Sequence, residues 1–327
     1  MISRYNRQEL LSFIGKTGQH KLLKSTAVVI GLGALGTVAA ELLARSGVMR
    51  LIIVDRDIVE LTDLQRQLLY DEGDIGKPKA LVAAEKLKRI NSEIYVAAAA
   101  NDIDYKNIPG IVGKPDAILD CTDNLETRFL INEYCLKNRL AWVHAAAIRE
   151  TAQLMSFDFK KGNAGLPCFA CVFGNAEAEE TCDTVGVLAS ATTTIAAMQF
   201  AEAIKLLTGK ATAPNLRRLN VWDSSLIGIE VKKKSNCSSC DSNNYGYLSG
   251  EKGSKIVSLC GKNAYQVKGK PVDLAKLKSR LQKIGAVTDF GECLSFGDIT
   301  LFKDGRALVK AKSVEEAKIA YARYVGN

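Results

Sequence analysis

Glycine and acidic residues near the N-terminus have the types and spacing of a nucleotide-binding turn. Gly31, Gly33 and Gly36 form the pattern GxGxxG, and Asp55 follows 19 residues after the last of them. Glycine lets the backbone bend tightly and approach a phosphate closely. The N–H groups at the start of a following helix would then bind that phosphate, and the acid is placed to accept a hydrogen bond from a ribose hydroxyl. The pattern therefore predicts a nucleotide site.

The flanking segments predict the strand, helix and strand that must hold this turn. Residues 27–30 and 51–54 are short apolar runs rich in β-branched residues, and residues 35–45 have the apolar spacing of a helix. Further strands are expected at 93–98, 116–119, 141–144, 151–158, 216–222 and 226–232, and further helices at 80–90, 126–138 and 187–207. The alternation to about residue 144 predicts a parallel sheet with helices on both faces, and the consecutive strands after 150 predict an antiparallel continuation. The fold class is α/β, with a Rossmann-like mixed sheet.

Charged residues follow the expected strand ends and indicate which nucleotide is bound. Arg66 and Lys79 come after the second strand, and Asp120 and Asp123 come after the fourth, where Mg²⁺ would bind. The carboxyl ends of parallel strands meet at one edge of a sheet, where ligands bind. A triphosphate needs cations and a metal-binding acid, whereas a dehydrogenase needs an acid or base beside the hydride. ATP with Mg²⁺ is therefore favoured over NAD, with Arg7 as a possible third cation.

Two CxxC pairs predict a structural metal site. Cys168 and Cys171 form one pair, and Cys237 and Cys240 form the other. Four thiolates satisfy the tetrahedral geometry of Zn²⁺ and leave no open position. A redox-active CxxC is the alternative, but it predicts one pair in a thioredoxin-like context, which the sequence lacks.

Cys182 differs from the other cysteines. It lies in an acidic segment just before an expected helix, whose amino end lowers the pKa of a thiol, whereas the acidic neighbours raise it. Spacing alone leaves a catalytic role open. Four further cysteines lie in apolar stretches and are expected to be buried, namely Cys121, Cys135, Cys260 and Cys293. His20 and His144 are too isolated to argue for a histidine-based mechanism.

The C-terminal part of the chain is basic. Residues 232–327 carry 18 Lys and Arg against 9 Asp and Glu, whereas residues 1–231 carry 26 against 27. This imbalance suggests an acidic partner or a solvated basic surface. After a polar segment at 233–254, strands at 255–259, 299–302 and 307–310 and helices at 272–284 and 315–324 predict a small α+β domain. The expected domains are residues 1–242 and 255–327.

The location of the protein is expected to be cytoplasmic. The first residues lack the apolar core of a signal peptide. The longest uncharged run, residues 184–201, is rich in Ala, Ser and Thr and predicts a helix buried in protein, with no membrane contact. Nine cysteines in such a chain indicate a reducing compartment.

Taken together and in this order, the motifs resemble the ThiF/MoeB/HesA family of ubiquitin-activating-like adenylyltransferases. The resemblance covers about residues 3–242. Its motifs are RYNRQ at 4–8, GLGALG at 31–36, Asp55, LQRQ at 64–67, GKPKA at 76–80, DCTDN at 120–124, the paired CxxC motifs and the lone Cys182.

The resemblance implies a reaction. The family binds ATP and Mg²⁺, adenylates the C-terminal Gly-Gly carboxylate of a ubiquitin-like sulfur-carrier protein, and releases pyrophosphate before a thiocarboxylate is made. It also implies a homodimer and a sulfur donor such as a cysteine desulfurase. The nucleotide site would comprise Gly31, Gly33, Ala34, Gly36, Asp55, Asp57, Asp63, Gln65, Arg66, Lys79, Asp123 and Asn124.

By matched motif, Asp55 would hold the ribose, Arg66 and Lys79 the phosphates, and Asp123 the Mg²⁺. Arg7 would reach the triphosphate of a neighbouring subunit, and Cys182 would have a functional role, since in some relatives this cysteine links covalently to the carrier. Arg7, Arg66, Asp123 and Cys182 are thus the expected catalytic residues.

The chain departs from the family pattern at two positions. Ala34 replaces a further turn glycine of many members, which should be tolerated, and position 63 is Asp where members commonly have Asn. A carboxylate at position 63 would add negative charge beside the phosphates unless it binds Mg²⁺. Three alternatives stay open: activation of a tRNA base or small molecule, a non-catalytic nucleotide-binding or nucleic-acid-binding scaffold, and a NAD-dependent oxidoreductase. The basic C-terminal domain would dock an acidic carrier or a tRNA, or serve only as a packing module.

Overall fold

The computed structural model describes residues 3–162, 165–174, 182–212, 214–252, 258–259 and 264–325. By its contacts the chain divides into two compact units. The first comprises Met1–Ile75 and Lys79–Lys252, and the second comprises Gly253–Asn327 with Gly76–Pro78. Each unit is described by itself below.

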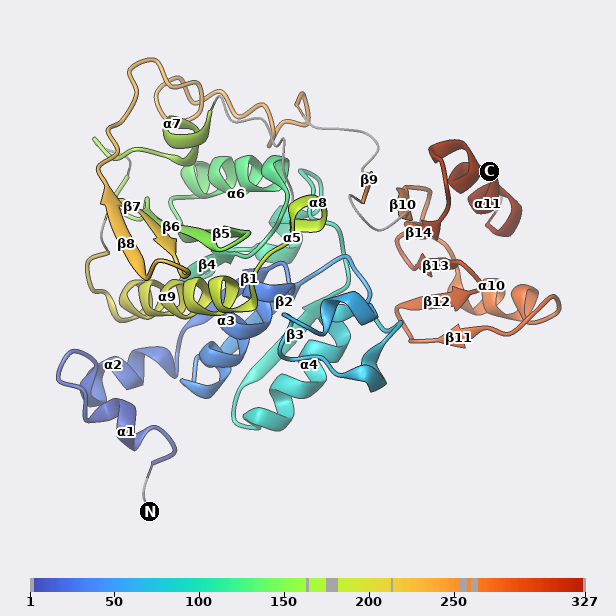
Figure 1. The fold of residues 1–327 in the computed structure, drawn as a ribbon, viewed down its shortest axis with the longest axis horizontal. Helices are drawn as coiled ribbons and strands as arrows, with labels where there is room; N and C mark the ends of the chain where they lie inside the picture. Colours follow the sequence, from blue (N-terminus) through green and yellow to red (C-terminus); the bar gives the residue numbers. More distant parts are fainter. Residues whose placement is uncertain are drawn as a thin grey trace. The chain divides into compact units, whose positions relative to one another are not determined.

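An eight-stranded mixed sheet forms the centre of the first unit (Figure 1). In spatial order the strands are β3 (Tyr95–Ala99), β2 (Arg50–Val54), β1 (Thr26–Ile30), β4 (Ala117–Asp120), β5 (Ala141–Ile148), β6 (Thr151–Asp158), β7 (Leu216–Asn220) and β8 (Ser225–Ile229). The pairs from β3 to β5 are parallel, and those from β5 to β8 are antiparallel. The predicted mixed sheet is confirmed, with parallel strands first and antiparallel strands after them.

Helices cover both faces of this sheet because alternate residues of each strand point to opposite sides. Ala27 and Val29 of β1 face one apolar core, and Val28 and Ile30 face the other. The first core is closed by α2 (Gly15–Leu22), α3 (Ala34–Arg45), α4 (Lys79–Ile90) and α9 (Ala189–Thr208), and the second by α5 (Ile108–Val112), α6 (Leu125–Asn138) and α7 (Phe169–Phe173) (Figure 1). Shorter elements of this unit are α1 (Asn6–Glu9), η1 (Leu61–Asp63), η2 (Glu72–Asp74) and α8 (Cys182–Val185).

The long uncharged run of the sequence contributes to α9, a helix of the protein core. Its Glu202 is 1% exposed and pairs with Arg217 at 3.0 Å and with Lys205 at 2.5 Å. Among the residues that the structure describes, no helix is both long and apolar enough to cross a membrane.

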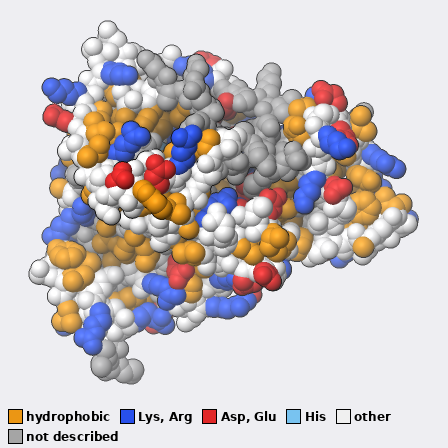
Figure 2. All heavy atoms as spheres, viewed as in Figure 1, with side chains coloured by type: hydrophobic (Ala, Val, Ile, Leu, Met, Phe, Trp, Pro, Cys, Tyr) orange, Lys and Arg blue, Asp and Glu red, His pale blue; other side chains and the backbone are white. Residues whose placement is uncertain are grey.

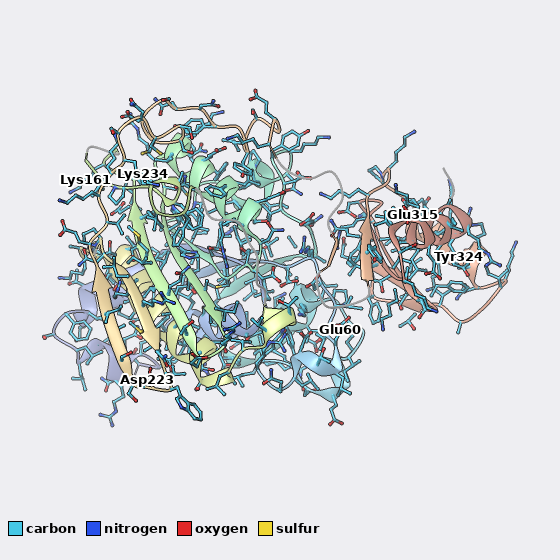
Figure 3. All side chains as sticks on the ribbon, turned by 45° about the horizontal axis from the view of Figure 1, so that its top comes forward. Glu60, Lys161, Asp223, Lys234, Glu315 and Tyr324 are labelled. Carbon is cyan, nitrogen blue, oxygen red and sulfur yellow. The ribbon has the colours of Figure 1, made fainter. Side chains whose placement is uncertain are left out.

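The surface of the first unit carries charges of both signs. In the space-filling view, Lys and Arg side chains alternate with Asp, Glu and apolar side chains over the face drawn (Figure 2). This mixture agrees with the near-zero balance of residues 1–231. Apolar exposure is high beside the β7–β8 turn, which Asp223 marks in Figure 3, and Trp222 is 78% exposed there.

The second unit is built on its own antiparallel sheet. The strand order is β11 (Thr288–Asp289), β12 (Cys293–Phe296), β13 (Ile299–Phe302), β14 (Ala307–Lys310), β10 (Ala264–Val267) and β9 (Ser258–Leu259). Two helices, α10 (Leu274–Leu281) and α11 (Val314–Tyr324), contribute to its apolar core. The β13–β14 hairpin that Asp304 and Gly305 predict is present, with Gly305 at a φ of +85°. The sequence patterns missed the short strands β10, β11 and β12.

Candidate functional site: the carboxyl edge of the parallel strands

The glycine turn joins β1 to α3 and cannot accept side chains at two of its positions. Gly31 has a φ of +89°, and a Cβ there would lie 2.6 Å from the carbonyl oxygen of Cys121. A Cβ at Gly36 would lie 1.8 Å from the carbonyl oxygen of Gly31. Gly33 is the N-cap of α3, and Ala34 begins the helix. The turn therefore places the first N–H groups of α3 at the carboxyl edge of the sheet, as an anion site requires.

Asp55 is tied directly to this turn. Its Oδ2 accepts a hydrogen bond from the backbone N–H of Leu32 at 2.5 Å, and its Oδ1 accepts one from the N–H of Asp57 at 2.7 Å. Burial and the nearby charge of Asp57 raise the pKa of Asp55, while Lys79 and the two backbone donors oppose that shift. The carboxylate thus fixes the turn and still has lone pairs for a further donor.

Two of the predicted cations gather around Asp63. The Nζ atom of Lys79 lies 3.0 Å from Asp63 Oδ2, and these side chains are 3% and 1% exposed. The other oxygen of Asp63 accepts a hydrogen bond from Nε2 of Gln67 at 2.7 Å, and Nη2 of Arg66 lies 3.7 Å from it. Arg66 is only partly buried, and its Nη1 donates to the carbonyl of Thr62 at 2.8 Å. The structure brings Asp63, Arg66 and Lys79 together, whereas Gln65 is exposed beside them.

Two buried residues that the sequence analysis missed connect this cluster to the glycine turn. The hydroxyl of Tyr70 lies 3.0 Å from the carbonyl oxygen of Leu32 and 3.3 Å from that of Lys79. Burial, with the nearby carboxylates, raises the pKa of Tyr70, so its hydroxyl remains a donor. Gln67 lies near Gly33, where a Cβ would come within 3.8 Å of its Nε2 atom. The second glutamine of the LQRQ motif was the available signal for Gln67.

Asp120 ends β4 and is fully buried. Its Oδ1 accepts hydrogen bonds from the N–H and hydroxyl of Thr122 at 3.0 and 2.7 Å. Its Oδ2 lies 2.8 Å from Nδ1 of His144 and 3.5 Å from Nε of Arg128. Burial alone would raise the pKa of Asp120, but the His144 hydrogen bond and the charge of Arg128 hold it below its ordinary value. Asp120 is therefore an ionised anchor inside the protein, and Asp123 is the acid at the surface.

His144 is not isolated, contrary to the interpretation of the sequence. The parallel register of β4 and β5 places it opposite Asp120. Burial lowers the pKa of His144, and the ring is therefore neutral near pH 7. Because the Asp120 carboxylate only accepts, Nδ1 carries the proton, and Nε2 faces the side-chain amide of Gln153 at 3.4 Å. The rings of Trp142, Phe169 and Phe173 pack around the imidazole.

Asp123 and Asn124 lie between β4 and α6. Asp123 is exposed, and the side chain of Asn124 caps α6 by accepting a hydrogen bond from the N–H of Thr127 at 3.1 Å. Burial would lower the pKa of Arg56, but the carboxylates of Asp57, Asp102 and Asp123 raise it. Asp123 is thus within electrostatic range of the loop that follows Asp55.

Arg7 lies at the opposite edge of the parallel strands within one chain. It is exposed on α1, two residues after Tyr5, whose hydroxyl lies 3.1 Å from Glu93 just before β3. On the same helix, Gln8 donates to the carbonyl of Ser46, the C-cap of α3 in the segment that leads to β2, at 3.2 Å. These contacts place α1 at the amino ends of β2 and β3, whereas the glycine turn lies at the carboxyl end of β1.

Cys182 begins α8, and its side chain lies outside what the structure describes. The backbone after this helix is bound to the end of β5: the N–H of Arg149 donates to Gly186 at 2.9 Å, and Leu188 donates back to Arg149 at 2.8 Å. Because β4 and β5 are parallel, α8 is attached at the same edge of the sheet as Asp123.

Four buried cysteines form a cluster that fits a metal ion. The sulfur atoms of Cys168, Cys171, Cys237 and Cys240 all lie within 4.8 Å of one another. Sulfur–sulfur separations of 3.9, 3.8 and 3.5 Å join Cys168 to Cys171, Cys168 to Cys237 and Cys171 to Cys240. A tetrahedral zinc site with Zn–S bonds of about 2.3 Å has edges of about 3.8 Å. The N–H of Lys234, labelled in Figure 3, lies 3.5 Å from the sulfur of Cys171.

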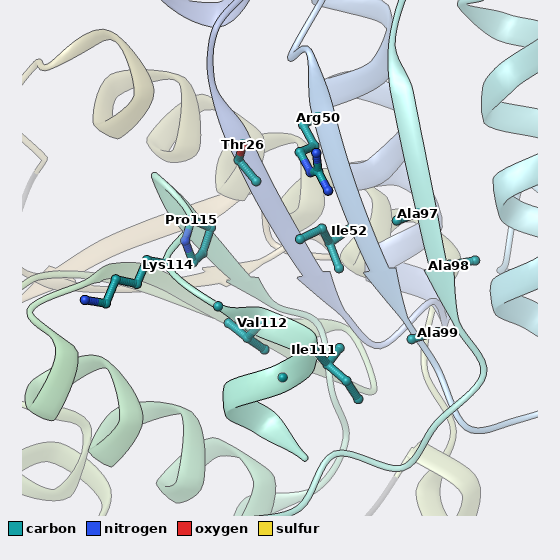
Figure 4. Close-up of a pocket in the computed structure, with 12 residues that line it drawn as sticks. Thr26, Arg50, Ile52, Ala97, Ala98, Ala99, Ile111, Val112, Lys114 and Pro115 are labelled. Carbon is teal, nitrogen blue, oxygen red and sulfur yellow. The ribbon is translucent and has the colours of Figure 1, made fainter. Parts of the chain in front are cut away.

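A pocket of about 550 Å³ lies on one face of the sheet, beside α5 (Figure 4). Its lining includes Thr26 and Arg50 at the amino ends of β1 and β2 and residues 97–99 of β3. The lining includes none of the residues predicted to bind the nucleotide.

The sequence and fold of the chain match known proteins over most of its length. A sequence model of the ThiF family matches residues 5–240. A Bacillus subtilis protein named sulfur carrier protein ThiS adenylyltransferase is 36% identical over 344 aligned positions, covering 100% of both chains. A protein of the same name from Escherichia coli is 37% identical over 245 positions, covering 74% of this chain and 96% of its own. The solved structure of Escherichia coli MccB with ATP shares the fold, with a TM-score of 0.62 at 23% identity over 73% of this chain and 74% of its own. The chain therefore belongs to the ThiF family and is an enzyme of the adenylyltransferase class.

Proposed function

We propose that this protein uses ATP to adenylate the C-terminal Gly-Gly carboxylate of a ubiquitin-like sulfur-carrier protein. The observation that carries the proposal is the full-length similarity to a protein named for adenylation of a sulfur carrier, ThiS. The carboxyl edge supports it, because a glycine turn, an acid tied to that turn, and two basic side chains converge there. A carboxylate is already a nucleophile, so positioning and charge neutralisation suffice for catalysis.

In the proposed reaction, a carboxylate oxygen of the carrier attacks the α-phosphorus of ATP. An oxygen–phosphorus bond forms to the carrier, and the bond from the α-phosphorus to the bridging oxygen breaks. The electron pair of that bond leaves with pyrophosphate, and an acyl-adenylate remains. The first N–H groups of α3 bind the phosphates, Asp55 accepts from the ribose, and Arg66 and Lys79 neutralise the leaving group.

The proposed function includes two kinds of metal ion, Mg²⁺ and Zn²⁺. Held at Asp123, Mg²⁺ would neutralise charge on the phosphates. In the cysteine cluster, Zn²⁺ would hold the segment around α7 to the segment that follows β8.

A second copy of the chain would supply the remaining cation. The position of Arg7 supports this part of the proposal, because α1 is bound at the opposite edge of the strands from the glycine turn. In a homodimer, Arg7 of one subunit would reach the triphosphate of the other. A persulfide on a donor such as a cysteine desulfurase would then attack the acyl carbon of the acyl-adenylate, so that a carbon–sulfur bond forms and AMP leaves. A further thiol would reduce the resulting acyl disulfide to the thiocarboxylate, with Cys182 near the same edge of the sheet.

Exchange of radiolabelled pyrophosphate into ATP tests the adenylation. We expect exchange only when a Gly-Gly-ended carrier from the same genome is present, and we expect none with that carrier after deletion of its last glycine. Exchange that requires tRNA alone, with no response to any carrier, would instead support activation of a nucleic acid. Absence of exchange with every cognate carrier would contradict the proposal.

A further inference from the structure

The ion pair between Asp63 and Lys79 lies against the glycine turn and neutralises a cation that the proposed function assigns to phosphate. The two charged groups are 3.0 Å apart, and neither side chain is more than 3% exposed. Two neighbouring side chains, Tyr70 and Gln67, show that the ion pair lies next to the glycine turn. Tyr70 bridges the carbonyls of Leu32 and Lys79, and the amide of Gln67, bound to Asp63, lies beside Gly33.

A carboxylate at this position opposes the binding of polyphosphate. It lowers the net positive charge that an incoming phosphate group meets, and its repulsion is weakly screened because the pair is buried. Asparagine has nearly the same shape and carries no charge. The carboxylate also stabilises the empty protein, because a buried lysine without a partner is costly.

The neighbouring turn offers an internal comparison. Asp63 is the third residue of η1 and accepts a hydrogen bond from the N–H of Glu60 at 3.0 Å. Asp74 is the third residue of η2 and accepts one from the N–H of Asp71, also at 3.0 Å. Each acid also pairs with a lysine of α4, since Lys86 lies 2.5 Å from Asp74. The two acids thus share their local structure, and Asp63 is the one connected to the glycine turn.

We propose that Asp63 is a counter-anion to Lys79 and Arg66 and that its negative charge keeps the affinity of the site for triphosphate and pyrophosphate low. This inference rests on the proposed function, because it takes Lys79 to be a phosphate-binding residue. A low affinity for pyrophosphate favours release of this product and hence forward adenylation. Asp63 acts through Lys79 and Arg66 and does not itself contact the reacting atoms.

Titration calorimetry of the full chain with ATP and with inorganic pyrophosphate, each with and without Mg²⁺, tests this role. We expect Asp63→Asn to bind both probes about tenfold more tightly than the wild type, which corresponds to about 1.4 kcal/mol. The matched control Asp74→Asn should leave both affinities within about twofold. In a Lys79→Met background, Asp63→Asn should still tighten the binding of both probes, because it again removes a negative charge that the phosphates meet, whereas a purely structural role for Asp63 predicts no such gain.

Circular dichroism establishes that each variant is folded. If Asp63→Asn does not fold, Asp63→Ser replaces it, because serine retains an oxygen that can cap η1. Equal or weaker binding of both probes by the folded Asp63 variant would overturn the inference. Weaker binding of ATP only when Mg²⁺ is present would also overturn it and would identify Asp63 as a metal ligand. A wild-type protein that binds neither probe would overturn the proposed function itself.

Discussion

The cysteine cluster and the carboxyl edge of the parallel strands belong to the same unit but differ in how complete they are. In the cluster, the four sulfur atoms already have nearly the separations of a tetrahedral site, and all four residues are buried. At the edge, Lys79 is paired with Asp63, Asp123 is exposed, and Arg7 lies at the other end of the strands. The cluster therefore has the properties of a structural site, whereas the proposed function requires the edge to exchange internal contacts for contacts with a ligand and a partner subunit.

The largest effect on stability is expected from Cys168→Ala. Removal of one of four thiolates should abolish tight metal binding and cost about 4 kcal/mol or more, as the loss of a structural metal does. Metal content by mass spectrometry and urea unfolding measure the two effects. The control is Cys135→Ala, a fully buried cysteine outside the cluster, which should keep the metal. A Cys168→Ala protein with full metal content and unchanged stability would contradict a structural metal site in the cysteine cluster.

At the carboxyl edge, Arg66→Ala should reduce activity far more than stability. We expect carrier-dependent pyrophosphate exchange to fall about 100-fold, because the proposed mechanism places this cation on the leaving phosphates. The free energy of unfolding should fall by about 1 kcal/mol or less, since Arg66 is partly exposed and 3.7 Å from its acidic partner. The control is Arg89→Ala, which alters an exposed arginine in the last turn of α4, at the opposite end of that helix from Lys79. This variant should leave exchange unchanged. Equal losses for both variants would argue against a phosphate role.

Mixed dimers test whether the edge is completed by a partner. Arg7→Ala and Asp123→Ala should each be nearly inactive. If Arg7 acts across the dimer, mixing and reassembling equal amounts of the two variants creates heterodimers with one intact site, and activity should recover to about one quarter of the wild type. Absence of recovery, with heterodimers demonstrated by mass spectrometry, would place the action of Arg7 within its own chain or outside the reaction.

The smallest effect is expected from the buried pair of His144 and Asp120. The folded-state pKa of His144 is lowered by burial, so the unfolded chain binds more protons as pH falls below about 6.5. The contribution of His144 to stability is therefore present above that pH and is lost toward its lower folded-state pKa. His144→Gln should make stability less sensitive to pH between 7 and 5, by about 1 kcal/mol in urea unfolding. The chain has only one other histidine, His20, which is exposed, and His20→Gln should leave that slope unchanged.

Sequence patterns predicted the features that are built from residues close together in the chain. The glycine turn, Asp55 and the two CxxC pairs lie where the sequence indicated, because each motif carries its own geometry. The pairing of Asp120 with His144 depends on the register of two strands, and the pairing of Asp63 with Lys79 depends on how η1 meets α4. No spacing rule links those residues. The short strands β10 to β12 escaped prediction because two to four residues are too few to establish a periodicity.

Mass spectrometry of the carrier after incubation with ATP, Mg²⁺ and this protein tests the proposed adenylation directly. We expect a carrier heavier by one adenylyl group at its C-terminal glycine, with an equal amount of pyrophosphate released. Hydroxylamine should remove the added group, since an acyl-adenylate is a reactive mixed anhydride. A carrier of unchanged mass in the presence of an enzyme that binds ATP and the carrier, with no release of pyrophosphate, would contradict adenylation of the carrier by this protein.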